Sequence, residues 1–464
     1  MKIIKKILLW SALFFAVLLL LLFIVNAFDE DLSPEISTLA TVPGAAVAQQ
    51  ENGYFNFYGF AAPAGQDAHQ RGVELVREYE QTTAGDQKRT IASGEDRNRE
   101  DNSIGFVGDR SKLCGRSSTS DQCLAFYARH GGDTSRLLAD NMLLLERYDR
   151  LIRYRHFQLT VKPYPTIPIP SFDLVRTAHQ LWLAKISRLL EQGERAAVLA
   201  ALQQEASFSR RMAEESSSMI DKLIAFMILS DDLRALSGII SMHNLMPAEK
   251  VAAEAILRPL TEPEMSFGRV FRYEFEMNRN FLTSAVKGGH LYALFESEST
   301  YEAASFLSKA KWFFIRPLLN VNATLNLLHR RYVNTLEFDA LSAKVFAARM
   351  KAGNVNRNGT ALRWNMIYNP AGKVYDAVLT PDYSEYTGRG HKLDGLMLLV
   401  SLQLLLKEKT VPKNSIVQFI KNSGPRYADP YTDDPMRWNE KNNSIYFEAS
   451  DGSGGLTDRV EIEL

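Results

Sequence analysis

An uninterrupted apolar stretch near the N-terminus is the first strong feature of the chain. Three lysines precede residues 7–28, a range without a charged side chain, and Asp29 follows it directly. As an α-helix these 22 residues span about 33 Å, close to a hydrocarbon core of about 30 Å, while the apolar region of a cleaved signal peptide covers only about 7–15 residues. We therefore predict a retained transmembrane signal-anchor at residues 1–28.

Cleavage is the alternative for this segment. Val25, Asn26 and Ala27 place small or aliphatic residues where a signal peptidase requires them. The lysines before the apolar range and the acidic residues after it hold the N-terminus in the cytoplasm by the positive-inside rule. We expect everything from Asp29 onward to form a periplasmic body on a single-pass inner-membrane anchor.

Helical periodicity dominates the middle of the chain, from about Thr134 to residue 410. Apolar residues recur there every three or four positions with charged residues between them, which is typical of amphipathic helices. Thr261 and Glu264 have the spacing of a capping box. Residues 393–406 are mostly apolar, but at about 21 Å they are too short to cross a bilayer and predict a buried helix. Two stripes are Leu138, Met142, Leu145, Tyr148 and Ile152, and then Val175, Ala178, Trp182, Ile186 and Leu189.

Three other segments lack this periodicity. Residues 29–66 combine a small, uncharged tether with the segment Asn52–Phe60, which has five aromatic side chains. We expect this segment to dock onto the body, with a partner protein as the alternative, because an exposed apolar patch marks an interaction site. Residues 67–133 are polar and contain both cysteines. Residues 354–380 are rich in Asn and Gly and fit short strands or loops equally well.

These patterns predict a mainly α fold. It consists of an N-terminal transmembrane helix, a multi-helix periplasmic body arranged as an irregular helical array, and a small C-terminal β-hairpin module. The expected order is the signal-anchor at 1–28, the tether and aromatic docking segment at 29–66, the polar region at 67–133, the helical body at 134–410, and a C-terminal helix with the β module at 411–464.

Composition and charge narrow the function classes. The chain has 464 residues, of which 46% are hydrophobic, so it can bury a large core and is not a small disulfide-stapled scaffold. Lysine and arginine number 54, as do aspartate and glutamate, and the net charge is +0. A dedicated nucleic-acid binder carries a basic excess, so we expect no nucleic-acid partner.

Cys114 and Cys123 are the two cysteines of the chain. Both lie in one polar stretch on the exported side, where an oxidising compartment lets a disulfide persist. Closing a loop of ten residues stabilises a fold by about 2.7 kcal/mol in the chain-entropy model. We predict a disulfide between them, against the alternative of two unrelated thiols. Their spacing is not one that suggests zinc or thiol redox chemistry.

The last 40 or so residues carry a distinct set of motifs. Asp429-Pro430 and Asp434-Pro435 favour turns, and residues 436–439 and 444–449 fit two short strands of a hairpin. An acidic, glycine-rich loop follows at 451–455. This segment resembles the tail of exported bacterial proteins that include the major pseudopilins of type II secretion. The chain lacks a prepilin cleavage motif and its body is far too large, so we do not assign it to the pseudopilins.

The resemblance implies a calcium site in the glycine-rich loop. Asp451 and Asp458, with a backbone carbonyl near Ser450, fall where some of the oxygen ligands lie in pseudopilins. A further aspartate of that family has no counterpart, since Arg459 and Val460 follow, and calcium takes six to eight oxygen ligands. Calcium at Asp451 and Asp458 is one interpretation of the loop, and a simple glycine-rich turn is the other.

The catalytic signatures that we sought are missing from the sequence. It contains no His-Glu-x-x-His, no Gly-x-Ser-x-Gly and no phosphate-binding glycine loop. We predict a non-catalytic scaffold or adaptor of a Gram-negative cell envelope that holds periplasmic or membrane proteins near the inner membrane, through Asn52–Phe60 and helix faces. The alternatives are an envelope hydrolase acting on peptidoglycan or another polymer, and an accessory of a secretion or pilus-type apparatus. No catalytic residue is assigned, and no cofactor other than calcium is expected.

Overall fold

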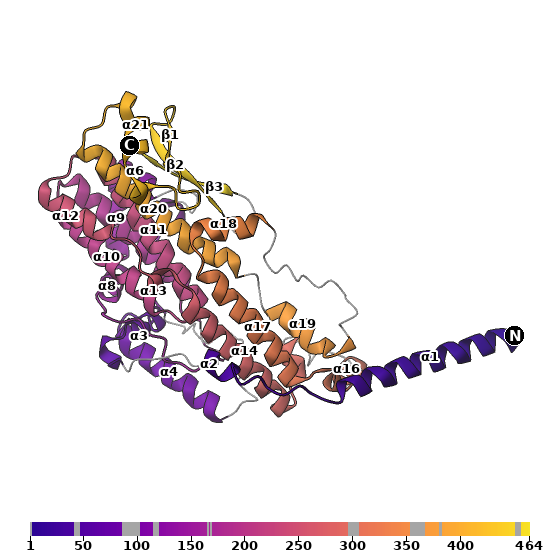
Figure 1. Ribbon diagram of the computed structural model, residues 1–464. Helices are drawn as coiled ribbons and strands as arrows, with labels where there is room; N and C mark the ends of the chain where they lie inside the picture. The colour runs from indigo at the N-terminus through magenta and orange to yellow at the C-terminus, as the bar shows by residue number, and fades with distance from the viewer. Residues whose placement is uncertain are drawn as a thin grey trace.

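A long helical body with one projecting helix makes up the structure (Figure 1). The computed structural model describes residues 2–40, 47–85, 103–114, 120–164, 167, 169–295, 306–352, 367–379, 383–450 and 456–464. The mainly α prediction is confirmed, since helices form the body and a small sheet is added at the C-terminal end. Helix α1 (Lys2–Asn26) leaves the body at one end, and the sheet lies at the opposite end.

Helix α1 is the part of the described chain that can cross a membrane. Its range Ile3–Asn26 is long and apolar enough for this, and its most apolar stretch is not buried inside the protein. Side chains such as Trp10, Phe14 and Phe15 are exposed along it. An exposed apolar helix of this length is consistent with a single-pass anchor, because the hydrocarbon core of a bilayer would solvate its side chains better than water does.

The next segment packs onto the body. It contains α2 (Ile36–Ala40), η1 (Gln49–Glu51), α3 (Gly53–Tyr58) and α4 (Ala68–Gly85). All five aromatic side chains of Asn52–Phe60 are buried in the common core, as the docking interpretation predicts. The expectation that this segment also offers a contact surface to partners is wrong, because buried rings are not accessible.

A layer of long helices forms the centre of the body. Helix α11 (Met219–Met242) is buried on nearly all sides and contacts α6, α9, α10, α20 and β3. A helix that is apolar all round is a core helix, so the other elements arrange themselves about it. The remaining elements of this half are η2 (Arg110–Lys112), α6 (Ser120–Arg129), α7 (Gly131–Asp140), α8 (Met142–Leu151), α9 (Phe172–Glu191) and α10 (Arg195–Glu215).

Two predicted stripes have different outcomes. Four residues of the second stripe, Val175, Ala178, Trp182 and Ile186, are buried on α9 as predicted, and Leu189 is partly buried. The residues of the first stripe do not belong to one helix, because the helix is interrupted at Asn141, between α7 and α8. The Asn141 side chain bonds the backbone of Val107, which fixes the break and leaves the next residue, Met142, 63% exposed.

The second half of the body repeats the helical pattern. The capping box is confirmed, since Thr261 and Glu264 bond each other's backbone N–H at the start of α13 (Glu262–Met265). The apolar range 393–406 lies within buried α20 (Ser384–Glu408). The other elements are α12 (Pro247–Ile256), α14 (Gly268–Gly288), η3 (Leu291–Leu294), α16 (Phe306–Ile315), η4 (Arg316–Leu318), α17 (Val321–Asp339), α18 (Ala343–Lys351), α19 (Pro370–Leu379), η6 (Lys413–Ser415), α21 (Ile416–Asn422) and η7 (Pro425–Tyr427).

The region 354–380 does not form the short strands that were one interpretation, as far as it is described. Residues 353–366 and 380 lie outside the described residues, but Pro370–Leu379 form helix α19. Ala371 and Tyr375 are buried on one face of α19, at helical spacing. Proline at the first position favours the helix start, which the strand interpretation overlooked.

A three-stranded antiparallel sheet in the order β1-β2-β3 closes the fold. The two predicted strands are confirmed as β1 (Arg437–Asn439) and β2 (Ser444–Ser450). The sequence analysis missed β3 (Leu456–Glu463), which pairs along β2 and buries the alternating residues Val460 and Ile462. The sheet packs on α20 and α11, and its core is continuous with that of the helices.

The sheet approaches α20 most closely at Gly395. A Cβ atom there would lie 2.5 Å from the Phe447 ring of β2, which is fully buried. We expect Gly395→Ala to lower the free energy of unfolding by about 1–3 kcal/mol, because an added methyl group overpacks this contact. Thermal and denaturant unfolding of the full chain in detergent measures the change.

Gly132→Ala is the matched control for this substitution. Gly132 lies in helix α7, and a Cβ there would meet nothing within 4 Å. Alanine in an open helical position stabilises a protein by about 0.4–1 kcal/mol. Equal effects of the two substitutions would contradict the close contact between α20 and β2.

Candidate functional site

Asn26 is the point at which the apolar helix meets the body. Its side-chain amide donates to the carbonyl oxygens of Leu22 (2.7 Å) and Ile367 (2.8 Å), and its Oδ1 accepts from the N–H of Asn369 (2.6 Å). Asn26 is buried, so these bonds are shielded from water. Helix α1 therefore ends in a fixed contact with the segment before α19.

Asp29 caps helix α17 from a distant part of the chain. The N-cap residue of α17, Asn320, makes no side-chain capping bond. Instead the two carboxylate oxygens of Asp29 accept from the N–H groups of Asn322 and Ala323, each at 2.9 Å. This carboxylate satisfies two otherwise unpaired donors and lies at the positive end of the helix dipole.

Asn326 holds the next residues along the same helix. Its side-chain amide donates to Glu30 Oε2 (3.0 Å) and to the carbonyl of Asp31 (2.9 Å), while its oxygen accepts from the N–H of Ser33 (2.9 Å). The beginning of the expected tether is thus bound along α17. Helix α2 continues this packing on α14 and α17, and residues 41–46 lie outside the described residues.

Asn369 links the two sides of this contact. Its Oδ1 accepts from the N–H of Asn320 (2.9 Å) and its Nδ2 donates to Thr324 Oγ1 (2.9 Å). Its φ of 50° is in the left-handed region, which asparagine tolerates better than most residues. We name this set the membrane junction, and its members are Asn26, Asp29, Asn320, Thr324, Asn326 and Asn369.

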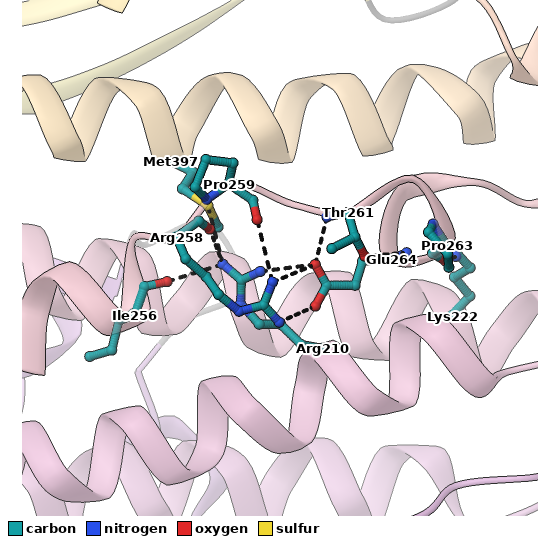
Figure 2. Close-up of polar contacts among 9 residues, drawn as sticks. All are labelled: Arg210, Lys222, Ile256, Arg258, Pro259, Thr261, Pro263, Glu264 and Met397. Carbon is teal, nitrogen blue, oxygen red and sulfur yellow. Dashed lines mark hydrogen bonds and ion pairs between the residues drawn. The ribbon is translucent and has the colours of Figure 1, made fainter. Parts of the chain in front are cut away.

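A buried ion pair joins α10 to α13 (Figure 2). Arg210 Nη1 donates to Glu264 Oε2 (3.0 Å), and its Nη2 donates to the carbonyl oxygens of Ile256 (3.1 Å) and Arg258 (2.5 Å). Arg258 adds a second ion pair to Glu264, and the N–H of Thr261 donates to the same carboxylate (2.7 Å). Burial opposes the charge of Glu264, but these donors outweigh it and hold its pKa below the usual value.

Lys222 lies beside this pair and is also buried. Its Nζ donates to the carbonyl oxygens of Ala213 (2.8 Å), Pro263 (3.3 Å) and Ser266 (2.5 Å), which match the three donors of an ammonium group. The rings of Phe226 and Phe267 also face it. Burial lowers the pKa of Lys222 to about 7. The three accepting carbonyls lie at the ends of α10 and α13, so Lys222 links α11 to these two helices.

Glu264→Gln is expected to destabilise the chain by about 3–5 kcal/mol, because it leaves the buried Arg210 guanidinium without its carboxylate. Denaturant unfolding of the full chain measures this loss. Asp433→Asn is the control, since Asp433 pairs with Lys344 at an exposed site where ion pairs contribute about 0–1 kcal/mol. A loss for Glu264→Gln no larger than that of the control would refute a structural role for the buried pair.

A second buried cluster surrounds His179 on α9. Its Nδ1 lies 3.1 Å from Glu205 Oε1 and its Nε2 lies 3.2 Å from Asp231 Oδ2, so two carboxylates hold one imidazole. Tyr148 donates its O–H to the same Glu205 oxygen (2.5 Å). Burial alone would lower the pKa of His179, but Glu205 and Asp231 outweigh it and raise the pKa to about 10. Burial and Glu205 also raise the pKa of Asp232 well above its usual range.

The raised pKa of His179 predicts how the stability of the protein changes with pH. The folded-state pKa of His179 lies above the unfolded value of about 6.5, so its stabilisation is fully present below pH 6.5 and is lost as the pH rises toward 10. We expect the stability difference between wild type and His179→Gln to be largest near pH 6.5 and to narrow by up to about 1.4 kcal/mol per pH unit above it.

Unfolding measured at several pH values between 6 and 9.5 tests this prediction. The difference between the two chains is the quantity to follow, because Lys222 titrates in the same window with the opposite sign. His130→Gln, at an exposed histidine, serves as the control and should keep the wild-type pH profile. A difference that stays constant with pH would show that His179 does not hold its extra proton.

Two surface pockets are described. One, of about 190 Å³, lies between α11, α20 and β3. Its apolar lining comes from Leu223, Phe226, Met227, Leu393, Leu396 and Val460, and its polar lining from Ser230, Arg234, Arg389 and Lys392. The other, of about 410 Å³, is an open depression lined by Ile152, Arg153, Ala200, Gln203, Gln204, Ser207 and Arg211. Neither is lined by His179, Glu205, Arg210, Lys222 or Glu264.

The residues that the sequence analysis singled out have three different outcomes in the structure. Cys114 and Cys123 form a disulfide, with Cα atoms 5.4 Å apart at the start of α6. Asp458 on β3 forms an ion pair with Lys392 of α20. Asp451 lies outside the described residues. Within the described ranges no three His, Cys, Asp or Glu side chains are grouped to hold a metal ion. The calcium site at Asp451 and Asp458 stays a prediction.

Sequence reasoning missed the two buried clusters and the membrane junction. A visible signal existed for Lys222 and Asp232, because each is a charged residue within an apolar helix. Compared with known protein families, characterised proteins and solved structures, the chain matches none. Its function is therefore inferred from its own geometry.

Proposed function

We propose that this protein is a membrane-anchored scaffold of the bacterial cell envelope, which holds a partner protein at a fixed height above the inner membrane. The membrane junction carries this proposal. A flexible tether would leave the body free to turn, whereas hydrogen bonds from residues 26–33 to α17 and to Asn369 join body and anchor firmly. Cleavage after Ala27 would separate Asn26 from the body, so the junction also favours a retained anchor.

The body is elongated, with α1 at one end and the sheet at the other (Figure 1). Helix α17 starts at the membrane junction and packs along α14, and α11 and α20 continue toward the sheet at the far end (Figure 1). Helices α11 and α20 have 24 and 25 residues, and each spans about 36–38 Å. Buried ion pairs join α10 to α13 and join α9 to α10 and α11, and they resist sliding of these packed helices. An object bound at the sheet end would then keep a set position relative to the anchor.

The pocket between α11, α20 and β3 is the surface that we propose for the partner. It lies near the sheet, away from α1 (Figure 1). Its apolar floor fits a large apolar side chain. Arg389 and Lys392 in its lining form exposed ion pairs with Glu385 and Asp458, and exposed pairs are weak enough for carboxylates of a partner to compete with them. Together with Arg234 they complement an acidic partner segment. We therefore expect a partner segment with one apolar anchor residue flanked by carboxylates. A scaffold fits this geometry better than a hydrolase, since the charged groups of the two buried clusters, around Glu264 and His179, hold helices together and line neither described pocket.

Site-specific crosslinking in intact cells tests this function. A photo-reactive residue in place of Met227, which lines the pocket, is expected to capture one protein reproducibly. The double substitution Arg234→Glu, Arg389→Glu should reduce this product at least tenfold, because like charges then face the partner. Lys287→Glu, at an exposed lysine at the end of α14, is the matched control and should leave the product unchanged.

A second arm tests the anchor. Asn26→Leu combined with a ten-residue Gly/Ser insertion between Ala27 and Phe28 should reduce capture several-fold at equal protein level, since the body then loses its fixed height. Failure to capture any protein at Met227 would contradict the proposal. So would equal capture in the charge-reversed chain.

A further inference from the structure

Helix α16 lies at the root of the apolar helix. It is followed directly by η4, and η4 contacts both α1 and α19. Figure 1 places α16 beside the point where α1 leaves the body. If α1 spans a bilayer, as the proposed function requires, α16 lies at the level where the hydrocarbon core ends.

Two adjacent aromatic side chains of α16 are unusually exposed. Phe313 is 79% exposed and Phe314 is 60% exposed, while the neighbouring Trp312 stacks on Phe295, and both of these rings are partly buried against the core. A body that buries most of its other phenylalanines leaves these two outside. Exposed aromatic residues grouped in this way mark contact with another apolar phase.

Exposed apolar residues also lie at the end of α1. Phe28 is 78% exposed just after α1, and its carbonyl accepts from the O–H of Tyr368 (3.3 Å). Ile367 is 49% exposed, and its carbonyl accepts from Asn26. Because η4 connects α16 to α1 and α19, these residues and α16 lie at the same end of the body (Figure 1), and the lipid that covers α1 is the nearest apolar phase.

Basic residues accompany this surface. Lys311 and Arg316 are exposed on either side of the two phenylalanines in the chain. Aromatic rings at the level of the headgroups, with basic side chains next to them, are the composition of helices that lie in a membrane interface.

We propose that α16 lies in the membrane interface, with Phe313 and Phe314 in the boundary of the acyl chains and Lys311 and Arg316 toward anionic headgroups. The protein thus contacts its membrane at two places, along α1 and along α16. This second contact fixes the tilt of the body, which one spanning helix alone leaves open. It rests on the anchoring part of the proposed function.

Nitroxide labelling of the full chain tests the position of α16. Single variants Phe313→Cys, Met142→Cys and Phe14→Cys, with the disulfide left oxidised, are labelled and reconstituted in vesicles of phosphatidylethanolamine and phosphatidylglycerol. Met142 is an exposed site on the body at the first residue of α8, and Phe14 lies in the middle of α1. Collision with oxygen and with a water-soluble nickel complex then reports the depth of each label.

We expect the label at residue 313 to collide with the nickel complex at least tenfold less than the label at residue 142. Equal collision rates at 313 and 142, with a buried label at 14, would overturn the interfacial position of α16 and leave the anchor intact. A water-exposed label at residue 14 would overturn the anchor itself. The two failures are therefore distinguishable.

Discussion

The structure depends on how the polar backbone groups at the membrane junction are satisfied. Helix α1 ends and α17 begins at this place, and both helix ends carry backbone groups that have no partner within their own helix. Asparagine is suited to this task because its amide both donates and accepts without a charge to desolvate. Asn26 and Asn369 bond each other's segment, and Asp29 adds its charge only at the more exposed start of α17.

The same reasoning explains the charged residues inside the body. Apolar helix faces can slide along each other by a turn with little loss of buried area. Arg210 with Glu264, and His179 with Glu205, each require one relative position of two helices, because an unpaired buried charge is costly. The ions are placed between α8, α9, α10, α11 and α13, where several similar helices meet.

Local sequence pattern predicted the elements that have a clear hydrophobic periodicity or clear capping and turn residues. Helix α1, the stripe on α9, the capping box at Thr261 and the hairpin of β1 and β2 follow from residues near each other in sequence. Helix α19 and strand β3 were missed, since a short apolar group next to glycines fits several structures. The membrane junction could not be predicted, because Asn26 and Asn369 are 343 residues apart and nothing in either local sequence names the other.

The position of β3 has a consequence for how the protein matures. Val460 and Ile462 close a core that begins at Ile36, and β3 packs on the central helix α11. Until this last strand has been synthesised and has docked, α11 and α20 keep an open apolar seam. Such a seam is what holding chaperones recognise, so the folding chain calls for protection until nearly all of it is available.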